Sequence, residues 1–384
     1  MEEQARKVCF VYRSQFTSHA AEQLALELVE LAPAGIDYAF FVSGGSEATE
    51  LTMRSALQYW RELGQPGKTR ILGRRISYHG MTMGSLSMSG HETRRADYSN
   101  LLHDLALAPP PYEYRFPAYR EDAEEHGAAA WDRILQQQNP DTIAAVIVEP
   151  IVGAAGGALT PPVGYLRALR RICDRHNVLL IADEVITGLG RTGTWFACQQ
   201  DDIAPDLIAV GKGLSSGYSP IGGVLFRNQI VEAFRKGSKS IPYGHTFSNN
   251  PLSAATCLAV LRYMKRMRVL ENVSERGLQL YRGLCELSSR FPCMADIRGR
   301  GLLWGFEFVA DRETRKPPPA GLQANIRFAA RCFDAGLIVY PAGFAPYNNA
   351  TLISPPLTIS EAEVDELLHR LGEGLASFSR DLAG

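Results

Sequence analysis

Apolar runs alternate with helical patterns along most of this chain, and this alternation restricts the fold more than any other feature. The runs stand at YAFFV (38–42), TRILGRRISYHG (69–80), TIAAVIVEP (142–150), VLLIADEV (178–185) and DLIAVGKG (206–213). Helical patterns lie before and between these runs, such as HAAEQLALELVELA (19–32), LTMRSALQYWRELG (51–64) and PPVGYLRALRRICDRH (161–176). Strands that alternate with helices predict an α/β fold, in which helices cover both faces of a mostly parallel sheet.

The pattern changes near Asn272, and the remaining residues predict a smaller α+β domain over 272–384. This tail comprises a long helix, strand-like residues, a second helix and a short strand, at 272–287, 296–310, 325–336 and 336–340. Upstream, the proline- and tyrosine-rich segment from Ala108 to Glu121 predicts a long irregular loop.

With 384 residues, 46% of them hydrophobic and 21% charged, the chain has the composition of a globular protein with more than one domain. Its 40 basic and 41 acidic side chains give a net charge of -1, so we expect no nucleic-acid partner. The seven cysteines are scattered without a CxxC pair or a tight Cys/His cluster, which predicts reduced thiols, no metal site and a cytoplasmic location. No apolar run approaches the length of a membrane span, and the opening residues lack a signal-peptide core, so we expect no membrane association.

Two of the predicted strands end in a charged residue, Asp183 in one and Lys212 in the other. Open α/β sheets bind their ligands at the carboxyl ends of strands. A carboxylate and an amine at such ends are what pyridoxal phosphate requires, because a lysine forms a Schiff base with its aldehyde and a carboxylate keeps its ring nitrogen protonated. Taken by themselves, the two residues would also fit a structural ion pair.

The segment SGGSEATE (43–50) supplies two glycines and a serine where a helix begins. Backbone N–H groups and the helix dipole attract an anion at such a position, so Gly44, Gly45 and Ser46 are candidates for a phosphate cradle. An ordinary strand-to-helix turn has the same pattern.

Three further residues are candidates for cofactor contacts. Tyr78 and His79 close another predicted strand, where an aromatic face can stack against a flat ring, although a core tyrosine is the commoner explanation. Thr246 lies in a polar turn ahead of a small-residue helix and, taken alone, would be a helix cap.

The segment GLGRTG (188–193) matches the GxGxxG pattern of dinucleotide-binding proteins. The residues after it, TWFACQQDD, make a poor helix, and no acidic ribose partner ends a following strand at the usual distance, so the pattern does not favour a nicotinamide cofactor. Motifs of nucleoside triphosphate sites, zinc proteases and serine hydrolases are absent.

Seven segments occur in an order that resembles the class III (omega-type) aminotransferases, a fold-type I family that depends on pyridoxal phosphate: SGGSEATE, SYHGMTMG, VEPIVGAAGG, IADEVITGLGRTG, AVGKGLSSGYSPIGG, GHTFSNNPLSAA and ISPPLTIS. The resemblance covers nearly the whole chain. It implies a seven-stranded, mostly parallel sheet and a homodimer with active sites at the subunit interface. It also implies a large cofactor-binding domain over 20–271, with residues 1–19 as the remnant of an N-terminal segment that belongs to the small domain.

The resemblance also implies a role for each candidate residue. Lys212 would carry the Schiff base, Asp183 would pair with the pyridine nitrogen, and Val185 and Tyr78 would pack on the two ring faces, next to His79. The remaining matches are the phosphate loop, a threonine donated to the neighbouring subunit, and a glutamate that supports the aspartate side of the site: Gly44, Gly45, Ser46, Thr246 and Glu149.

The chain departs from the family pattern at four places. The phosphate loop has Gly44 where a serine is usual, which predicts a lower cofactor affinity. The arginine that commonly holds the α-carboxylate of 2-oxoglutarate is replaced by Leu352, and its shielding glutamate by Ala154. Three other arginines, which we interpret as loop or surface residues, are the candidates to replace the clamp: Arg115, Arg191 and Arg298. The chain also starts at a point that resembles the inside of family members, after the N-terminal segment that helps to build their substrate pocket. Two interpretations are open: a misassigned start site, or a natural truncation with a more open pocket.

The implied activity is a ping-pong transfer of an amino group from an amine or amino acid to a keto acid or aldehyde. Because Leu352 makes one corner of the pocket apolar, we expect an amine or an ω-amino acid to fit better than a dicarboxylate. A decarboxylase, racemase or phospho-lyase of the same family would share every motif. A truncated homologue without turnover is the alternative of another class.

Overall fold

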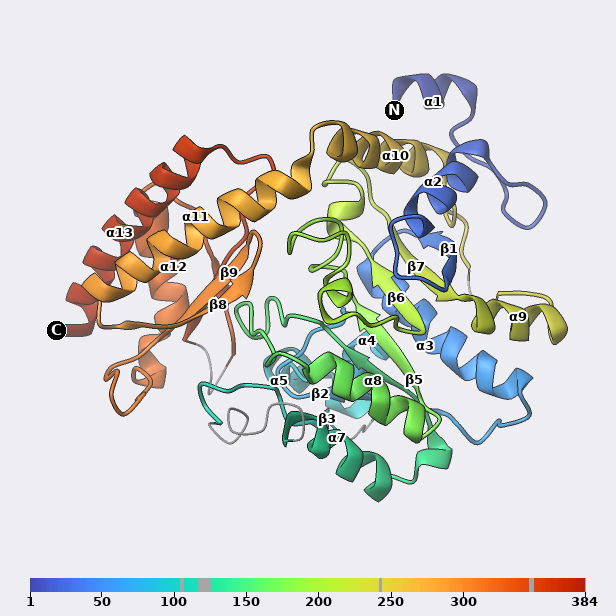
Figure 1. The fold of residues 1–384 in the computed structure, drawn as a ribbon, viewed down its shortest axis with the longest axis horizontal. Coiled ribbons are helices and arrows are strands. Elements are labelled where there is room, and N and C mark those ends of the chain that lie inside the picture. The colour runs from blue at the N-terminus through green and yellow to red at the C-terminus, as the bar shows by residue number, and fades with distance from the viewer. Residues whose placement is uncertain (104–106, 117–125, 242–243, 345–348, 384) are drawn as a thin grey trace.

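A computed structural model describes residues 1–103, 107–116, 126–241, 244–344 and 349–383 of the chain. Within these ranges the chain forms two sheets, a larger one of seven strands and a smaller one of four. The smaller sheet and its helices lie at one end of the molecule and the larger sheet fills the rest (Figure 1).

The larger sheet has the strand order β1-β7-β6-β5-β4-β2-β3. β7 runs antiparallel to both of its neighbours, and the other neighbouring pairs are parallel. This arrangement confirms the predicted fold class. In chain order the strands are Ile36–Val42 (β1), Arg70–Arg74 (β2), Leu107–Ala108 (β3), Ile143–Val148 (β4), Leu179–Asp183 (β5), Leu207–Val210 (β6) and Gly222–Arg227 (β7).

The central strands are apolar throughout because both faces of the sheet are covered. Successive side chains of β5 point to opposite faces, so Leu180 belongs to one buried cluster while Leu179 and Ile181 belong to another. The first cluster contains residues of α2 (His19–Val29), α7 (His126–Gln137), α8 (Tyr165–Arg175) and α10 (Pro251–Arg266). The second contains residues of α3 (Gly45–Glu62) and α9 (Asn228–Lys236).

The smaller sheet is antiparallel and has the strand order β10-β11-β9-β8. Aromatic rings from its strands and helices meet in a separate buried cluster, in which Phe308 packs against Phe328 and Phe378. The elements are Met294–Arg300 (β8), Leu303–Phe308 (β9), Tyr340–Ala342 (β10), Ala350–Ile353 (β11), Val269–Arg290 (α11), Ala324–Asp334 (α12) and Glu361–Ala383 (α13). The prediction of a smaller α+β part is confirmed. The domain boundary at residues 271 and 272 stays a prediction, and α11 runs through it.

The structure corrects two local predictions and adds one strand. Ala108, placed in an irregular loop, belongs to β3, which pairs with the end of β2. The following residues 109–116 are irregular as predicted, and residues 117–121 of that loop lie outside the described ranges. The strand predicted at 336–340 begins only at Tyr340, because Gly336 and Leu337 end α12 through hydrogen bonds to Phe333 and Cys332. β7 was not among the runs recognised in the sequence.

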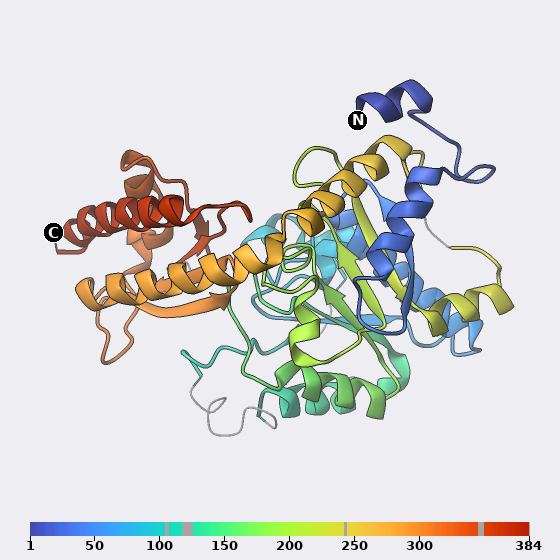
Figure 2. The same cartoon turned by 45° about the horizontal axis from the view of Figure 1, so that its top comes forward.

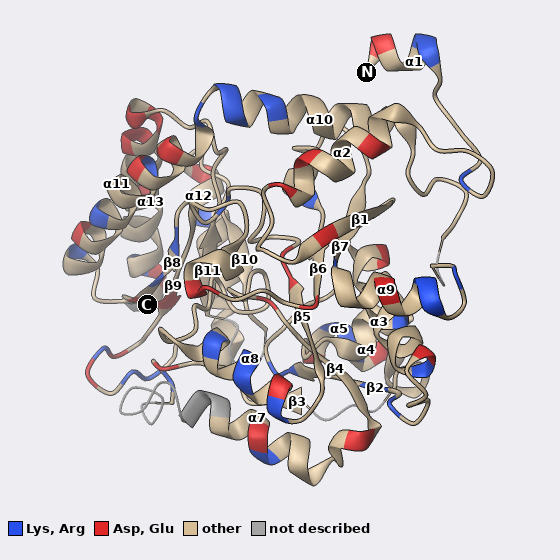
Figure 3. Cartoon of the chain, turned by 45° about the vertical axis from the view of Figure 1, so that its right-hand side comes forward, with Lys and Arg blue, Asp and Glu red and all other residues tan. Residues whose placement is uncertain are grey.

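Shorter elements complete the fold: α1 (Glu2–Lys7), α4 (Met83–Met88), α5 (Glu92–Arg95) and the 3-10 turns Ala96–Leu101, Pro140–Thr142, Ala197–Asp201, Lys212–Leu214 and Ala320–Leu322. The N-terminus and the C-terminus lie at opposite ends of the molecule (Figure 2). Basic and acidic residues are interspersed on both parts of the fold (Figure 3). Among the described helices, none combines the length and apolar character needed to cross a bilayer.

Candidate functional site

A cavity of about 540 Å³ opens at the carboxyl ends of the parallel strands, where the smaller sheet approaches the larger one. This volume lies within the range of small-molecule sites. From the larger part its lining includes Gly45, Ser46, Tyr78, His79, Gly80, Arg94, Glu149, Ala154, Asp183, Val185, Ile186, Gly188, Leu189, Arg191, Lys212 and Gly213. From the smaller part it includes Tyr340, Leu352, Ser354 and Leu357. Most of the predicted site residues therefore share one cavity.

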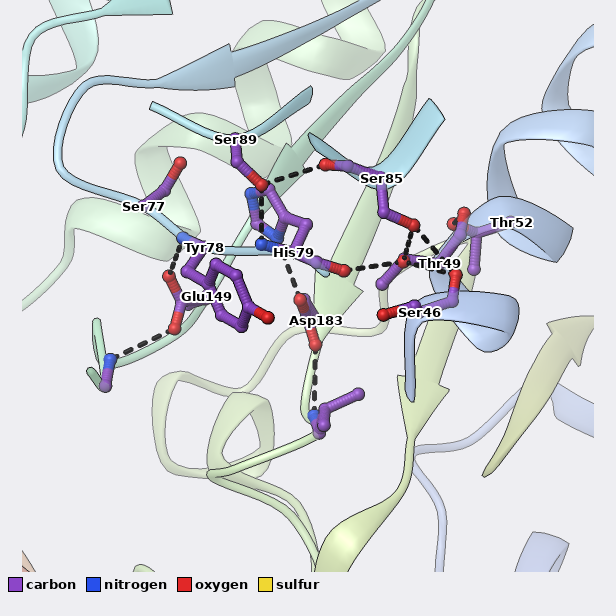
Figure 4. Close-up of polar contacts among 12 residues, drawn as sticks. Ser46, Thr49, Thr52, Ser77, Tyr78, His79, Ser85, Ser89, Glu149 and Asp183 are labelled. Carbon is purple, nitrogen blue, oxygen red and sulfur yellow. Dashed lines mark hydrogen bonds and ion pairs between the residues drawn. The ribbon is translucent and has the colours of Figure 1, made fainter. Parts of the chain in front are cut away.

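Asp183 is the last residue of β5 and is buried together with His79. Its Oδ2 lies 2.8 Å from Nδ1 of His79, and its Oδ1 accepts a hydrogen bond from the Val185 backbone at 3.1 Å (Figure 4). The protein alone thus holds both carboxylate oxygens in place. A fixed carboxylate of this kind can face a protonated ring nitrogen without reorganising.

Glu149 follows β4 and holds two loops beside the cavity. Its carboxylate accepts the backbone N–H of Tyr78 at 2.9 Å and that of Gly153 at 3.0 Å (Figure 4). Burial raises the pKa of Glu149 above its ordinary value, against the opposing effect of nearby His79. Glu149 therefore acts on the site by fixing the position of Tyr78.

The sequence had suggested that Tyr78 and His79 lie at the end of a strand. In the structure they lie beyond that end, in the loop that follows. β2 stops at Arg74, and the chain turns away because Ile76 adopts φ +55°. The loop is then tied to α3: the Thr49 hydroxyl donates to the His79 carbonyl oxygen at 2.7 Å. This attachment brings His79 to Asp183.

Lys212 follows β6 and adopts φ +35°, a conformation that costs a non-glycine residue about 1–3 kcal/mol. Its side chain is exposed within the cavity lining. Strain of this kind persists where the surrounding structure enforces it, as it commonly does at functional positions. The structure therefore presents the lysine amine to the cavity.

The first turn of α3 forms another part of the cavity wall. Gly44 is the N-cap and supplies no side chain to cap the helix. The first backbone N–H groups of a helix have no acceptor within it, so those of Gly45 and Ser46 are available to an anion. The turn is braced by Ser85, whose hydroxyl donates to the Ser46 carbonyl oxygen at 2.8 Å (Figure 4). This arrangement suits a phosphate group.

Thr246 does not line the cavity. It is exposed on a turn at residues 246–249, which is fixed to β1 by hydrogen bonds between Asn249 and Phe41. Gly44 is not among the lining residues either, although it precedes Gly45 directly.

The positions at which the chain departs from the family pattern can now be placed. Leu352 and Ala154 both line the cavity, so the apolar corner faces the site. Arg191 also lines it, and its guanidinium donates to the carbonyl oxygens of Leu302 and Pro355. Burial lowers the pKa of Arg191 to about 10.

The other two arginines lie away from the cavity and converge on one carboxylate, Glu307 of β9. Arg298 was interpreted as a loop or surface residue, and this was wrong: it lies on β8 and is 8% exposed. Its charge can be buried because Asp296 and Glu307 both pair with it. Arg115 is a loop residue, as expected.

Two residues that the sequence did not suggest contribute to the site. Arg94 of α5 lines the cavity. Glu184, next to Asp183, is fully buried and accepts the backbone N–H groups of Ala197 and Cys198 at 3.0 and 2.8 Å. It thereby fixes the start of the 3-10 turn Ala197–Asp201, which follows the GLGRTG segment. Two adjacent acidic residues after an apolar run are a signal that could have indicated this second carboxylate.

The family model for class III aminotransferases matches residues 1–375 of this chain. A curated relative, the uncharacterised aminotransferase YodT of Bacillus subtilis (strain 168), is 41% identical over 388 residues, which cover 100% of this chain and 87% of that protein. A chloroplastic gamma-aminobutyrate transaminase 3 of Solanum lycopersicum is 35% identical, with 92% of this chain and 68% of that protein covered. Among solved structures, an omega transaminase from Pseudomonas jessenii in complex with PMP is 30% identical, covers 100% of this chain and 84% of that one, and gives a TM-score of 0.94.

Proposed function

This chain belongs to the class III aminotransferase family, and from this premise we propose that it moves an amino group from an amine or amino acid to a keto acid or aldehyde with pyridoxal phosphate as cofactor. The observation that carries the proposal is that Lys212, Asp183 and the first turn of α3 all border one cavity. These three features supply an amine, a carboxylate and an anion site, which are the groups that this cofactor needs.

The residues present fit the cofactor. The uncapped N–H groups of Gly45 and Ser46 would hold its phosphate, and the oriented carboxylate of Asp183 would face its ring nitrogen. Tyr78 and Val185 would bound the ring. When bound, pyridoxal phosphate supplies an aldehyde that forms a Schiff base with an amine and a ring that withdraws electrons from the neighbouring carbon.

The chain's own residues would then act on the substrate. Nζ of Lys212 would serve as the base that takes the proton from the amine-bearing carbon of the donor. His79 keeps the Asp183 carboxylate in position through its 2.8 Å contact. The same groups would serve both half-reactions, which is why we propose ping-pong kinetics.

We further propose a cytoplasmic homodimer in which Thr246 contacts the phosphate in the neighbouring subunit. Support comes from the turn that carries Thr246, which is exposed and yet anchored to β1. Exposed aromatic side chains also gather beside it, where Phe10 packs against Phe247 with ring centroids 6.2 Å apart. Light scattering of the purified protein would give its mass, and Thr246→Ala would weaken cofactor binding.

The experiment that tests the function follows nitrogen-15 from a labelled donor into a carbonyl acceptor, with carbon dioxide and substrate chirality measured in parallel. Labelled amine in the acceptor, with parallel double-reciprocal plots, supports the aminotransferase. Release of carbon dioxide, racemisation or elimination without nitrogen transfer would contradict the aminotransferase proposal. Such a result would assign the protein one of the other reactions of this family. A protein that binds the cofactor and transforms no donor would be a homologue without turnover.

A further inference from the structure

Arg94 brings a guanidinium into the cavity, and within the described ranges it has no acidic partner. It lies on α5 and is half-buried. Its guanidinium carbon stands 4.3 Å from the centre of the Tyr78 ring, and its Nη2 lies 3.4 Å from the hydroxyl oxygen of Tyr340. Among the described residues, no carboxylate forms an ion pair with Arg94. A cation that is partly withdrawn from water and left unpaired is suited to an anionic ligand.

The position of this guanidinium relates directly to Leu352. Tyr340 of β10 is the register partner of Leu352 on β11, so the two side chains stand side by side on the same face of the smaller sheet. Arg94 reaches the Tyr340 hydroxyl from the larger part of the molecule. Leu352 had suggested that this corner of the cavity is apolar. The guanidinium of Arg94, which comes from α5, approaches the same corner.

The other charged groups around the cavity are already engaged. Arg191 donates to two backbone carbonyl oxygens, and the carboxylates of Asp183 and Glu149 accept hydrogen bonds from the protein. His91 stacks on Phe344 behind Tyr78, and burial lowers its pKa to about 4, so it is neutral near pH 7. Lys212 is committed to the cofactor by the proposed function. Of the cations that the described residues place around the cavity, Arg94 is thus the one that remains for a substrate.

We infer that Arg94 binds the carboxylate of the substrate, so that the natural donors and acceptors are amino acids and keto acids and not simple amines. This inference rests on the proposed function and specifies its substrate class. A guanidinium offers two parallel N–H donors that match the two oxygens of a carboxylate. Its stacking on Tyr78 orders the side chain in advance, and the long contact with Tyr340 is easily exchanged for a shorter one to an anion.

The kinetic test compares pairs of donors that differ in one group. 4-Aminobutyrate and n-butylamine differ by a carboxylate in place of a methyl group, as do 3-aminopropanoate and n-propylamine. We expect Arg94→Gln to lower kcat/KM for the amino acids by about 10- to 100-fold, with a change of less than about threefold for the amines. Arg94→Lys, which keeps the charge and loses the fork, should fall between. Arg75→Gln is the matched control, because Arg75 is exposed and lies outside the cavity lining.

A binding test separates the inference from the proposed function. Ligand-observed NMR on the protein with its cofactor bound would give dissociation constants for butyrate and for its neutral isostere butyramide. Butyrate should bind about 10-fold or more weakly to Arg94→Gln, while butyramide is unaffected. Equal effects on the charged and the neutral ligand, or no effect on either, would overturn the inference even if the protein transfers amino groups. Arg94-dependent binding of butyrate without transfer from any donor would uphold the carboxylate site and overturn the proposed function.

Discussion

The carboxylate of Asp183 and the imidazole of His79 meet at 2.8 Å in a buried contact that joins the end of β5 to the loop after β2. Because the other oxygen of Asp183 is held by the Val185 backbone, the carboxylate cannot turn away from this arrangement without losing a hydrogen bond. The geometry leaves the Asp183 carboxylate fixed in the lining of the cavity.

Removing that charge should impair the reaction and leave the fold intact. We expect Asp183→Asn to lower kcat by about 10³-fold or more, because the amide cannot stabilise a protonated ring nitrogen. Steady-state kinetics and the thermal midpoint of both proteins would check this. Asp202→Asn, at an exposed aspartate, serves as the control. A loss of less than tenfold would mean that Asp183 has no electrostatic role.

The glycine at the N-cap of α3 should be replaceable by serine with a gain in cofactor affinity. A Cβ at Gly44 would meet no atom within 4 Å, and its φ of -173° is open to any residue. The added hydroxyl should lower the dissociation constant of pyridoxal phosphate by about three- to tenfold. Gly44→Ala adds the carbon without the oxygen and should leave affinity unchanged. Equal affinities of the serine and alanine variants would contradict a phosphate contact at this position.

His91 should make the protein less stable in mild acid. Burial and the neighbouring Arg94 lower its pKa from 6.5 to about 4, so the unfolded chain binds a proton between these values and the folded chain does not. The contribution of His91 to stability is therefore complete above pH 6.5 and is lost as the pH falls toward 4, by up to about 3 kcal/mol.

His91→Phe keeps a ring against Phe344 and removes the titration. We expect urea unfolding of this variant to depend less on pH than that of the wild type over the same range. Parallel pH profiles for the two proteins would show that His91 titrates normally in the folded state.

The buried Glu307 should be essential for stability although it is remote from the cavity. It accepts hydrogen bonds from Tyr112 and Asn349 and pairs with Arg115 and Arg298. Removing one partner of such a network leaves buried charges uncompensated, so Glu307→Gln should cost about 3–5 kcal/mol in urea unfolding. Glu313→Gln, at an exposed glutamate, should cost less than about 0.5 kcal/mol. A cost for Glu307→Gln as small as that of the control would contradict this assignment.

The sequence was sufficient for five of the seven strands of the larger sheet and for most of the cavity, because these strands have a clear apolar pattern. Strands such as β4 and β5 are apolar at every position, so they are visible as runs, and the fold brings their carboxyl ends together. Asp183 and Lys212 could therefore be assigned to the same site from the sequence alone. β3 escaped notice because it has two residues and adjoins a proline-rich segment.

What the sequence could not give are contacts that depend on packing between distant segments. Arg94 belongs to a four-residue helix, and its place beside Tyr340 depends on how the two parts of the molecule meet. Arg298 carries a full charge, which favours a surface position, and only the three-dimensional structure shows Glu307 beside it. No local pattern encodes such pairings.

The central claim is that Lys212 is the residue to which pyridoxal phosphate becomes attached, and one measurement tests it directly. The protein is incubated with pyridoxal phosphate, reduced with borohydride and digested, and the peptides are analysed by mass spectrometry. We predict a phosphopyridoxyl group on the peptide that contains Lys212, and no such label after treatment of Lys212→Ala. A label on another lysine, or an unlabelled Lys212 peptide at saturating cofactor, would contradict the account.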